Sequence, residues 1–337
     1  MIRVAVDAMG GDTAPQAEIA GVVQALVALP GKFLVQLVGR PEAIKAELEK
    51  YPDADRSRIE LHEAAEVIGM GEKPLAAVRK KPNSSIVIGL GLQKSGRSDA
   101  FVSAGNTGAI LAASTILLEL HDGVERATVA TLFPTLDQPV LVLDGGANVD
   151  CSARELVNFA YLGSVYMRDV LRRDSRTIRL LTVGEEEEKG NAITREAHTL
   201  LKRSPRLHYI GNIEGRDIVA GHHKFGVVDV VVCDGFVGNV VLKFYESVGR
   251  MFVGLLKQQL PEMLHRPEMK ELFRILDYSE YGGAPLLGVR GVSIICHGAS
   301  PANAIKNAIR VAVQSVQADL SKHIGAEFAE RDAAAPA

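Results

Sequence analysis

Short apolar stretches alternate with amphipathic segments along almost the whole chain. Residues 2–6 place apolar side chains at alternate positions, and residues 15–29 repeat them every three or four positions. The first spacing is typical of a strand and the second of a helix. By the same patterns, strands are predicted at 2–6, 33–38, 58–62, 99–103, 127–133, 139–143, 177–183, 207–211, 228–233 and 292–296. Helices are predicted at 15–29, 41–50, 74–80, 84–95, 106–119, 152–170, 191–202, 238–259, 262–276 and 301–322.

This alternation predicts an α/β fold, with a mainly parallel sheet covered by helices on both faces. We expect residues 1–327 to form a single catalytic domain, or two subdomains that share a cleft, with a helical hairpin at about 238–276. Residues 328–337 are polar and rich in alanine, which predicts a frayed tail.

Composition narrows the class of protein. Lys and Arg number 38 against 41 Asp and Glu, so the net charge of -3 argues against a nucleic-acid binder that relies on bulk charge. No apolar run has the length of a membrane span, and the N-terminus has no signal-peptide pattern, which favours the cytoplasm. Cys151, Cys233 and Cys296 lie far apart, and we interpret them as reduced thiols. A catalytic thiol remains an alternative, because His297 follows Cys296.

The first predicted strand ends in a glycine loop with two carboxylates. Asp7-Ala8-Met9-Gly10-Gly11-Asp12 follows the strand, and a helix comes next. Glycine lets a ligand approach the backbone, and a helix N-terminus offers unpaired N–H groups to an anion. Asp7 and Asp12 would repel a bare phosphate, however, so this loop is more suited to shape a cleft and to orient its neighbours.

Other glycine loops follow later strands and carry Asn, Ser or Thr beside glycine. A glycine turn can merely connect two elements, but their recurrence at strand ends predicts one polar cleft built by several loops. Lys189 follows four glutamates, so it belongs either to a solvated charge run that caps a helix or to the cleft, where it would neutralise an oxyanion. The loops span 103–109, 144–148, 184–191, 234–239 and 297–300.

Several common catalytic motifs are absent from the sequence. The chain contains neither G-x-x-x-x-G-K-[ST] nor G-x-S-x-G, and the first loop does not match G-x-G-x-x-G. The histidines show no H-x-x-x-H ligand spacing, and most of them are predicted at the surface, with His297 as the exception because of its loop. A nucleotide-binding loop and a hydrolase-type serine are therefore not supported.

Taken together and in order, the loop motifs resemble those of the phosphate acyltransferase family, the PlsX family of bacterial phospholipid synthesis. The resemblance covers about residues 2–320, and the stretch before Lys189 is richer in glutamate than the family pattern. The matching motifs are Asp7-Ala8-Met9-Gly10-Gly11-Asp12, Lys81-Pro82-Asn83-Ser84-Ser85, Ser103-Ala104-Gly105-Asn106-Thr107-Gly108-Ala109, Gly146-Ala147-Asn148, Glu188-Lys189-Gly190-Asn191, Asp234-Gly235-Phe236-Val237-Gly238-Asn239, Tyr281-Gly282-Gly283 and His297-Gly298 with Ser300.

The resemblance implies a three-layer αβα fold of the isocitrate/isopropylmalate-dehydrogenase type, a homodimer, and a reaction between fatty acyl carrier protein and inorganic phosphate. Direct attack of phosphate on the thioester needs no protein nucleophile, and the site is predicted without cofactor or metal. Lys189 and Asn239 are the candidate catalytic residues. The candidate substrate-binding residues are Asp7, Gly10, Gly11, Asp12, Ser103, Gly105, Asn106, Thr107, Gly108, Asn148, His297 and Ser300, of which Gly105 to Gly108 are expected to hold phosphate.

The predicted hairpin suggests two further contacts. Acyl carrier proteins are acidic, and the candidate docking residues on this hairpin are the basic residues Lys257, Arg266, Lys270 and Arg274. Its apolar set around Met251 to Leu264 belongs to a core or dimer contact, or touches a membrane surface at the hairpin tip. The family resemblance implies peripheral association with the inner face of the cell membrane and a downstream glycerol-phosphate acyltransferase.

Two other functions stay open at this level. An NAD-dependent decarboxylating dehydrogenase on the same fold predicts a metal site of clustered aspartates, for which Asp144, Asp150 and Asp234 are far apart in sequence. A non-catalytic phosphate- or acyl-binding regulator predicts binding without turnover. Release of carrier-protein thiol that depends on phosphate separates the acyltransferase from both.

Overall fold

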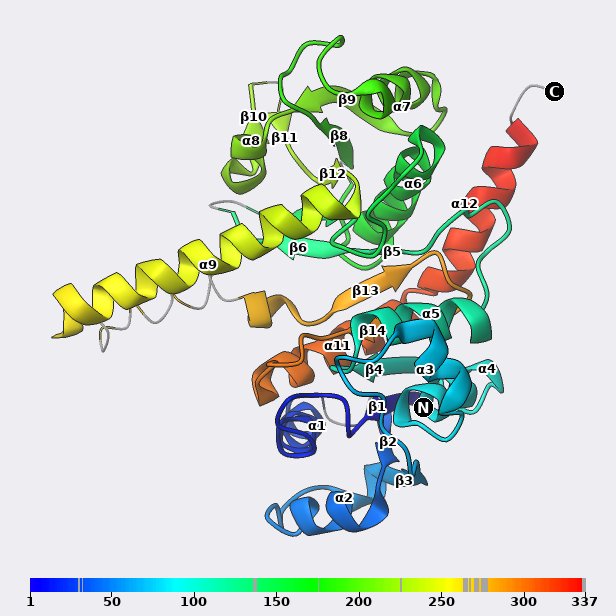
Figure 1. The fold of residues 1–337 in the computed structure, drawn as a ribbon, viewed down its shortest axis with the longest axis vertical. Coiled ribbons are helices and arrows are strands. Elements are labelled where there is room, and N and C mark those ends of the chain that lie inside the picture. Colours follow the sequence, from blue (N-terminus) through cyan, green and yellow to red (C-terminus); the bar gives the residue numbers. More distant parts are fainter. Residues whose placement is uncertain are drawn as a thin grey trace. The chain divides into compact units, whose positions relative to one another are not determined.

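Two compact units make up the chain. The computed structural model describes residues 1–29, 31, 33–135, 138–174, 176–224, 226–262, 266, 268–269, 273 and 278–334. Unit 1 comprises Met1–Ala127 with Tyr281–Ala337, and unit 2 comprises Thr128–Glu280. Each unit has its own sheet and its own apolar core (Figure 1).

In unit 1 the strands stand in the order β3-β2-β1-β4-β14-β13. Neighbouring strands run parallel except β13 and β14, which are antiparallel. The strands are β1 (Ile2–Asp7), β2 (Phe33–Gly39), β3 (Ile59–Glu63), β4 (Ala100–Ser103), β13 (Ala284–Leu287) and β14 (Ser293–Ile295). The chain builds outward from β1 to β3 and then returns to place β4 on the other side of β1, so the strand order reverses between β1 and β4.

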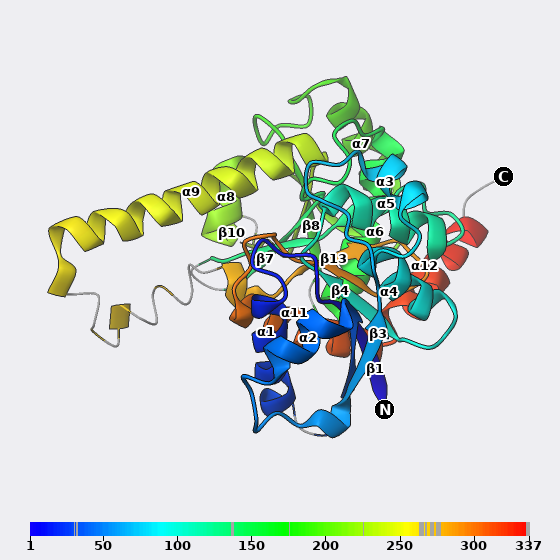
Figure 2. The same cartoon turned by 60° about the horizontal axis from the view of Figure 1, so that its bottom comes forward.

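Helices cover both faces of this sheet. The helices of unit 1 are α1 (Gln16–Ala28), α2 (Pro41–Leu48), α3 (Pro74–Lys80), α4 (Ser85–Lys94), α5 (Thr107–Leu117), α11 (Ala302–Gln317) and α12 (Leu320–Ala334), with a 3-10 turn at Arg56–Arg58. A second 3-10 turn, Tyr278–Tyr281, lies where the chain passes from unit 2 back to unit 1. Val4 and Val6 pack in one core with side chains of α1, α2 and α11. Phe101 contacts Gly89 of α4 on the opposite face, and α4 packs on α5 (Figure 2).

Unit 2 repeats the same layering. Its main sheet has the order β6-β7-β12-β8-β9, parallel except for β6. The strands are β5 (Thr128–Val129), β6 (Thr131–Phe133), β7 (Val140–Leu143), β8 (Thr177–Leu181), β9 (His208–Ile213), β10 (His222–His223), β11 (Gly226–Val227) and β12 (Val230–Val232). Helix α6 (Ala153–Asp169) packs on β7, β12 and α7 (Ala192–Arg203). The other face carries α8 (Gly215–Ala220) and the first turns of α9 (Gly235–Gln259).

The layered α/β architecture predicted from the sequence is thus confirmed, while two boundaries differ. The helix expected over 301–322 breaks at Asp319, whose φ is +50°, and α12 starts beyond it. α12 continues to Ala334 and buries Phe328, so the expectation of a frayed tail from residue 328 is wrong up to that point. α9 forms the first arm of the expected hairpin, and most of the second arm lies outside the described residues. Within the described ranges, no helix is both long and apolar enough to cross a membrane.

Candidate functional site

The site loops of unit 1 follow three neighbouring strands. Residues 8–12 follow β1, residues 104–106 follow β4, and residues 296–300 follow β14. Because these strands are parallel neighbours, their carboxyl ends meet at one edge of the sheet. The strand order reverses between β1 and β4, and α/β proteins bind their ligands at the sheet edge where such a reversal occurs. Most of the predicted substrate-binding residues are therefore brought together here.

Asp7 points into the protein rather than toward a ligand. Its side chain is only 1% exposed and accepts hydrogen bonds from the Ser103 hydroxyl at 2.6 Å and from the Met9 N–H at 3.0 Å. Ser103 in turn accepts the N–H of Gly105 at 3.0 Å. Burial raises the pKa of Asp7, and hydrogen bonds from Ser103 and Ser85 oppose that rise. The carboxylate therefore joins two loops and is shielded from solvent.

Gly10 and Asp12 connect this loop to its two neighbours. A Cβ on Gly10 would stand 2.6 Å from the backbone nitrogen of Gly105, so only glycine permits this approach. The exposed Asp12 donates its backbone N–H to the carbonyl of Gly298 at 2.8 Å. The loops after β1, β4 and β14 therefore form one connected surface.

Glu18 is a buried residue that the sequence analysis does not identify. It lies in the first turn of α1, is 1% exposed, and accepts the N–H of Gly11 at 3.1 Å. Burial raises the pKa of Glu18 to about 7, and the nearby Asp7 and Asp12 add to the rise. The only signal in the sequence is an acidic residue near the start of a helix, which is common at surface positions.

The side chain of Asn106 is already occupied within unit 1. Its Oδ1 caps α5 by accepting the N–H of Ala109 at 3.0 Å, and its Nδ2 donates to the carbonyls of Gly69, Met70 and Glu72 at 3.0–3.3 Å. Asn106 therefore ties residues 69–72 to the start of α5. The backbone N–H groups of Thr107 and Gly108 stand in the first helical turn, where no helical carbonyl can accept them.

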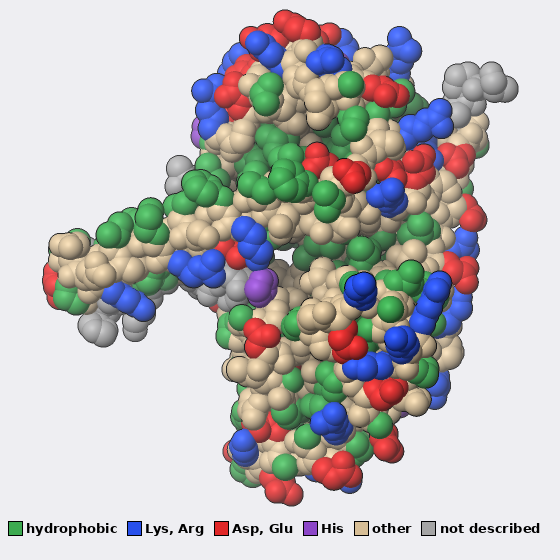
Figure 3. Space-filling view, viewed as in Figure 1, with side chains coloured by type: hydrophobic (Ala, Val, Ile, Leu, Met, Phe, Trp, Pro, Cys, Tyr) green, Lys and Arg blue, Asp and Glu red, His purple; other side chains and the backbone are tan. Residues whose placement is uncertain are grey.

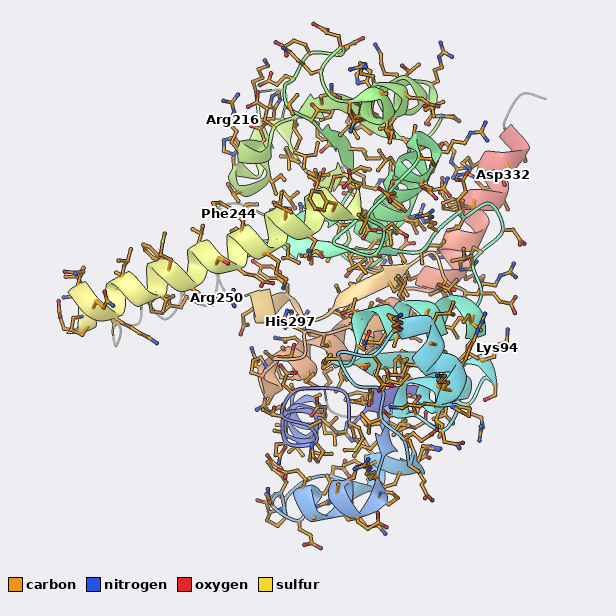
Figure 4. The ribbon with its side chains drawn as sticks, in the orientation of Figure 1. Lys94, Arg216, Phe244, Arg250, His297 and Asp332 are labelled. Carbon is orange, nitrogen blue, oxygen red and sulfur yellow. The ribbon has the colours of Figure 1, made fainter. Side chains whose placement is uncertain are left out.

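His297 and Ser300 lie on the loop after β14. His297, which is labelled in Figure 4, is exposed, whereas Ser300 is buried. The Ser300 N–H donates to the His297 carbonyl at 2.9 Å, which closes a turn before α11. Of the two, only His297 presents its side chain at the surface of this unit.

Unit 2 has its own group of loops at the ends of three adjacent strands. Asn148 lies in the loop after β7, Lys189 lies in the loop after β8, and Asn239 lies in the second turn of α9, the helix that follows β12. The strand-end loops that the sequence predicts to build one polar cleft are thus divided between the two units. A fourth residue, the buried Asp144, determines how the first of these loops folds.

Asp144 is surrounded by backbone donors. Its Oδ1 accepts the N–H groups of Val129, Gly146 and Ala147 at 3.0–3.2 Å. Its Oδ2 accepts both the backbone N–H and the side-chain amide of Asn148 at 2.7 Å. The Asn148 amide is thus held by Asp144. Both carboxylate oxygens of Asp144 accept hydrogen bonds from backbone N–H groups, whereas a metal ligand of a dehydrogenase would need a carboxylate oxygen directed at the ion.

Asn239 stands against the loop that Asp144 organises. It is exposed in the second turn of α9, and its Cβ lies 3.3 Å from the point where a Cβ on Gly146 would stand. A Cβ on Gly238 would meet the carbonyl oxygen of Asp144 at 1.9 Å, so α9 begins in direct contact with this loop. Asp234 caps the helix by accepting the N–H of Val237 at 2.8 Å.

Lys189 is the exposed cation of the third loop. Its Cγ lies 2.8 Å from the position that a Cβ on Gly184 would occupy, so the side chain passes close to the start of the loop. Its ammonium group makes no ion pair with the described residues. The glutamates before it do not cap the next helix, because Asn191 caps α7 by accepting the N–H of Thr194 at 2.9 Å. Lys189 is therefore available to an anion.

The three cysteines are buried and unbonded. Burial raises the pKa of Cys151 and of Cys296 to about 12, and it raises that of Cys233 well above its usual value. Since the thiolate is the reactive form, none of them is suited to attack a thioester at neutral pH. No cluster of three or more His, Cys, Asp or Glu side chains fit to hold a metal ion occurs among the residues that the structure describes.

Solved structures and sequence relatives identify the class and the family. The fold is similar to that of a phosphotransacetylase from Streptococcus pyogenes, with a TM-score of 0.62, 17% identity and 94% of each chain covered. Unit 1 and unit 2 thus have the architecture found in phosphotransacetylases. Residues 2–323 match the family described as fatty acid synthesis protein. The chain belongs to the phosphate acyltransferase family.

Two relatives show how close this membership is. A phosphate acyltransferase of Heliobacterium modesticaldum is 47% identical over 335 residues, which cover 96% of this chain and 98% of the relative. A phosphate acyltransferase of Citrifermentans bemidjiense is 49% identical over 319 residues, which cover 92% of this chain and 88% of the relative. The family resemblance inferred from the loop motifs is confirmed.

Proposed function

We propose that this enzyme transfers a fatty acyl group from the thioester of an acyl carrier protein to inorganic phosphate. A phosphate oxygen bonds to the carbonyl carbon, the carbon–sulfur bond breaks, and the products are an acyl phosphate and the carrier-protein thiol. The names of the relatives and the fatty acid synthesis family support this reaction. The acyl phosphate would enter phospholipid synthesis through a glycerol-phosphate acyltransferase, which we propose as the downstream partner.

The open start of α5 is the observation that carries the proposal. It lies where the strand order reverses, and the N–H groups of Thr107 and Gly108 point out of the first turn. Its cap, Asn106, is neutral, and the carboxylate of Asp7 is buried against Ser103. We propose that these N–H groups bind phosphate and that His297 supplies a further polar contact.

Lys189 and Asn239 are the groups that we propose for catalysis. Negative charge develops on the carbonyl oxygen and on the departing sulfur when phosphate attacks the thioester. A compact, unpaired ammonium group such as that of Lys189 and an amide such as that of Asn239 would stabilise this charge. The raised pKa values of the buried cysteines support direct attack by phosphate over an acyl-enzyme.

A thiol-release assay tests this function. The enzyme is incubated with palmitoyl carrier protein with and without inorganic phosphate, and free thiol is measured. We expect release only when phosphate is present. Release that is indifferent to phosphate, or no release, would refute the acyltransferase. The same assay separates the alternatives, since a phosphate- or acyl-binding regulator would bind without turnover. The dehydrogenase is further disfavoured because Asp144 and Asp234 bond to the backbone.

Helix α9 leaves a long apolar surface uncovered. Val237, Val241 and Tyr245 pack on the core of unit 2, and the same stripe continues to positions 248, 252 and 255 without cover. Figure 3 shows apolar side chains along the length of α9. The exposed apolar residues of the helix are Phe236, Val240, Phe244, Val248, Met251, Phe252 and Leu255, followed by Leu260 just beyond it.

We propose that a second copy of the chain covers this surface in a homodimer and that its end near Leu260 contacts the inner face of the cell membrane. Phe244→Glu is expected to lower the sedimentation coefficient toward that of a monomer. Leu255→Glu is expected to weaken co-sedimentation with anionic liposomes. Val27→Glu is the matched control, since Val27 is an apolar residue of α1 that is more exposed than either Phe244 or Leu255. Equal behaviour of all three variants would contradict both proposals.

Basic residues near the same helix are proposed to dock the acidic carrier protein. Lys257 and Arg266 are exposed, and Arg250 lies on the extended part of α9 (Figure 4). Lys270 and Arg274 lie outside the described residues. Lys257→Glu should raise the KM for acyl carrier protein while the KM for phosphate stays constant.

A further inference from the structure

The four glutamates before Lys189 differ in what they contact. Glu185 contacts the buried side chain of His223, and Glu187 forms an ion pair with Lys202 at the surface. Glu188 makes no ion pair with any described residue. We propose that Glu185 and His223 are positioning residues, which hold the loop at 184–190 and thereby place Lys189 for the reaction. This inference rests on the proposed role of Lys189.

The contact between Glu185 and His223 is built into the interior of unit 2. The side chain of His223 is 3% exposed, and its Nε2 lies 3.2 Å from the Oε1 of Glu185. On its other side, the Nδ1 of His223 lies 3.3 Å from the Nη2 of Arg179. A guanidinium can only donate, so Nδ1 is the acceptor there and Nε2 carries the proton toward Glu185. Arg179 therefore sets the tautomer in which Nε2 faces Glu185, at ion-pair distance but outside hydrogen-bond geometry.

Arg179 is itself fixed. It is 1% exposed on β8, and its Nη1 donates to the carbonyl of Ile210 on the neighbouring strand β9. A chain of contacts thus runs from two strands of the sheet, through Arg179 and His223, to the carboxylate of Glu185. Because its inner members are buried and held on both sides, this chain restricts the loop more than a surface ion pair would.

Further bonds carry the restriction from Glu185 to Lys189. The buried Asn212 donates its Nδ2 to the carbonyl of Glu186 at 2.9 Å, and the N–H of Lys189 donates to the same carbonyl at 3.1 Å. Lys224 also pairs with Glu185. Arg216, labelled in Figure 4 on α8, lies 3.7 Å from Glu185 and is mostly exposed, so it contributes little.

Two contacts of Glu187, in the same stretch of four glutamates, restrict the loop less because they lie at the surface or are long. Glu187 is 68% exposed, and its pair with Lys202 at 2.7 Å lies in solvent. The Nε2 of His198 is 3.6 Å from Glu187, while its Nδ1 is bonded to Tyr209 at 2.8 Å. Glu188, which is exposed and adjacent to Lys189, is the matched control for Glu185.

Hydrogen exchange of the full-length enzyme tests whether the loop is held. Glu185→Ala is expected to speed amide exchange in residues 184–190 about tenfold, since loss of a partly buried charged contact changes a local opening equilibrium by about that factor. Glu188→Ala should leave it unchanged. His223→Gln, whose amide can still donate to Glu185, should protect the loop better than His223→Leu. Equal exchange in Glu185→Ala and Glu188→Ala would overturn the proposal.

A double-mutant cycle tests whether the loop acts through Lys189. Glu185→Ala should lower kcat about tenfold or more with little change in the KM for carrier protein, because small displacements of a catalytic group are costly. In the Lys189→Ala background the same substitution should have almost no further effect. Losses that simply multiply would overturn the positioning role. The proposed function is tested separately, in the wild-type enzyme: it is refuted if phosphate causes no release of carrier-protein thiol.

Discussion

Replacing Asp144 with asparagine should destabilise unit 2 far more than the near-identical shape suggests. The carboxylate accepts three N–H groups on Oδ1 and two donors of Asn148 on Oδ2. Asparagine has one oxygen and one NH₂ group, so at least two of these bonds are lost and donors then face donors. Hydrogen bonds to a charged acceptor contribute about 1.5–3 kcal/mol each, which gives a loss of about 3–6 kcal/mol.

Urea unfolding followed by far-ultraviolet circular dichroism measures this loss, since the chain has no tryptophan. With a slope of about 3 kcal/mol per molar urea, the midpoint of Asp144→Asn should fall by about 1–2 M. Asp234→Asn is the control, because Asp234 caps α9 through Val237 and asparagine caps a helix equally well. A midpoint for Asp144→Asn within about 0.3 M of the wild type would refute this account of the loop.

Three further substitutions test other parts of the account. The pKa of Glu18 is raised to about 7 in the folded state, so the protonated side chain favours folding. Its contribution to the free energy of unfolding is complete below the ordinary pKa of 4.5 and is lost as pH rises through 7. Glu18→Gln should therefore remove about 3 kcal/mol of pH dependence between pH 5 and 8 in urea titrations. Gly238→Ala should lower the free energy of unfolding by about 3 kcal/mol in the same assay, because the new Cβ clashes with the Asp144 carbonyl. Gly249→Ala, which has open space around it, should raise the free energy of unfolding by up to about 1 kcal/mol. Thr107→Asp adds negative charge at an exposed position in the first turn of α5 and leaves the Asn106 cap in place, and it should raise the KM for phosphate about tenfold in steady-state kinetics.

Periodicity predicts most of the fold because the main elements have clear apolar faces. It fails where local and tertiary preferences differ. The stretch at 127–133 reads as one strand, but it divides into β5 and β6. The apolar pattern of α11 continues through the break at Asp319, and α12 beyond it buries Phe328. β13 follows two glycines and contains a proline, so its sequence has the features of a turn.

The strand-end loops are predictable from the sequence, but the use of their side chains is not. Asn106 and Asn148 are polar residues beside glycine, as expected of ligand contacts, yet their amides bond to residues 69–72 and to Asp144. The partners of Asn106 lie more than 30 residues away in sequence, so no local pattern reveals them. In the sequence, Asp144 is only the first residue of a glycine loop and one of three scattered aspartates, and Glu185 is only one of four glutamates.

Direct attack of phosphate on the thioester is the central claim, and product stoichiometry tests it most directly. Radiolabelled phosphate and palmitoyl carrier protein are mixed with excess enzyme in a single turnover, and acyl phosphate and thiol are measured together. The account predicts one acyl phosphate for each thiol, no thiol without phosphate, and a large loss of both products in Lys189→Ala. A burst of thiol before phosphate is added would show an acyl-enzyme and contradict the claim.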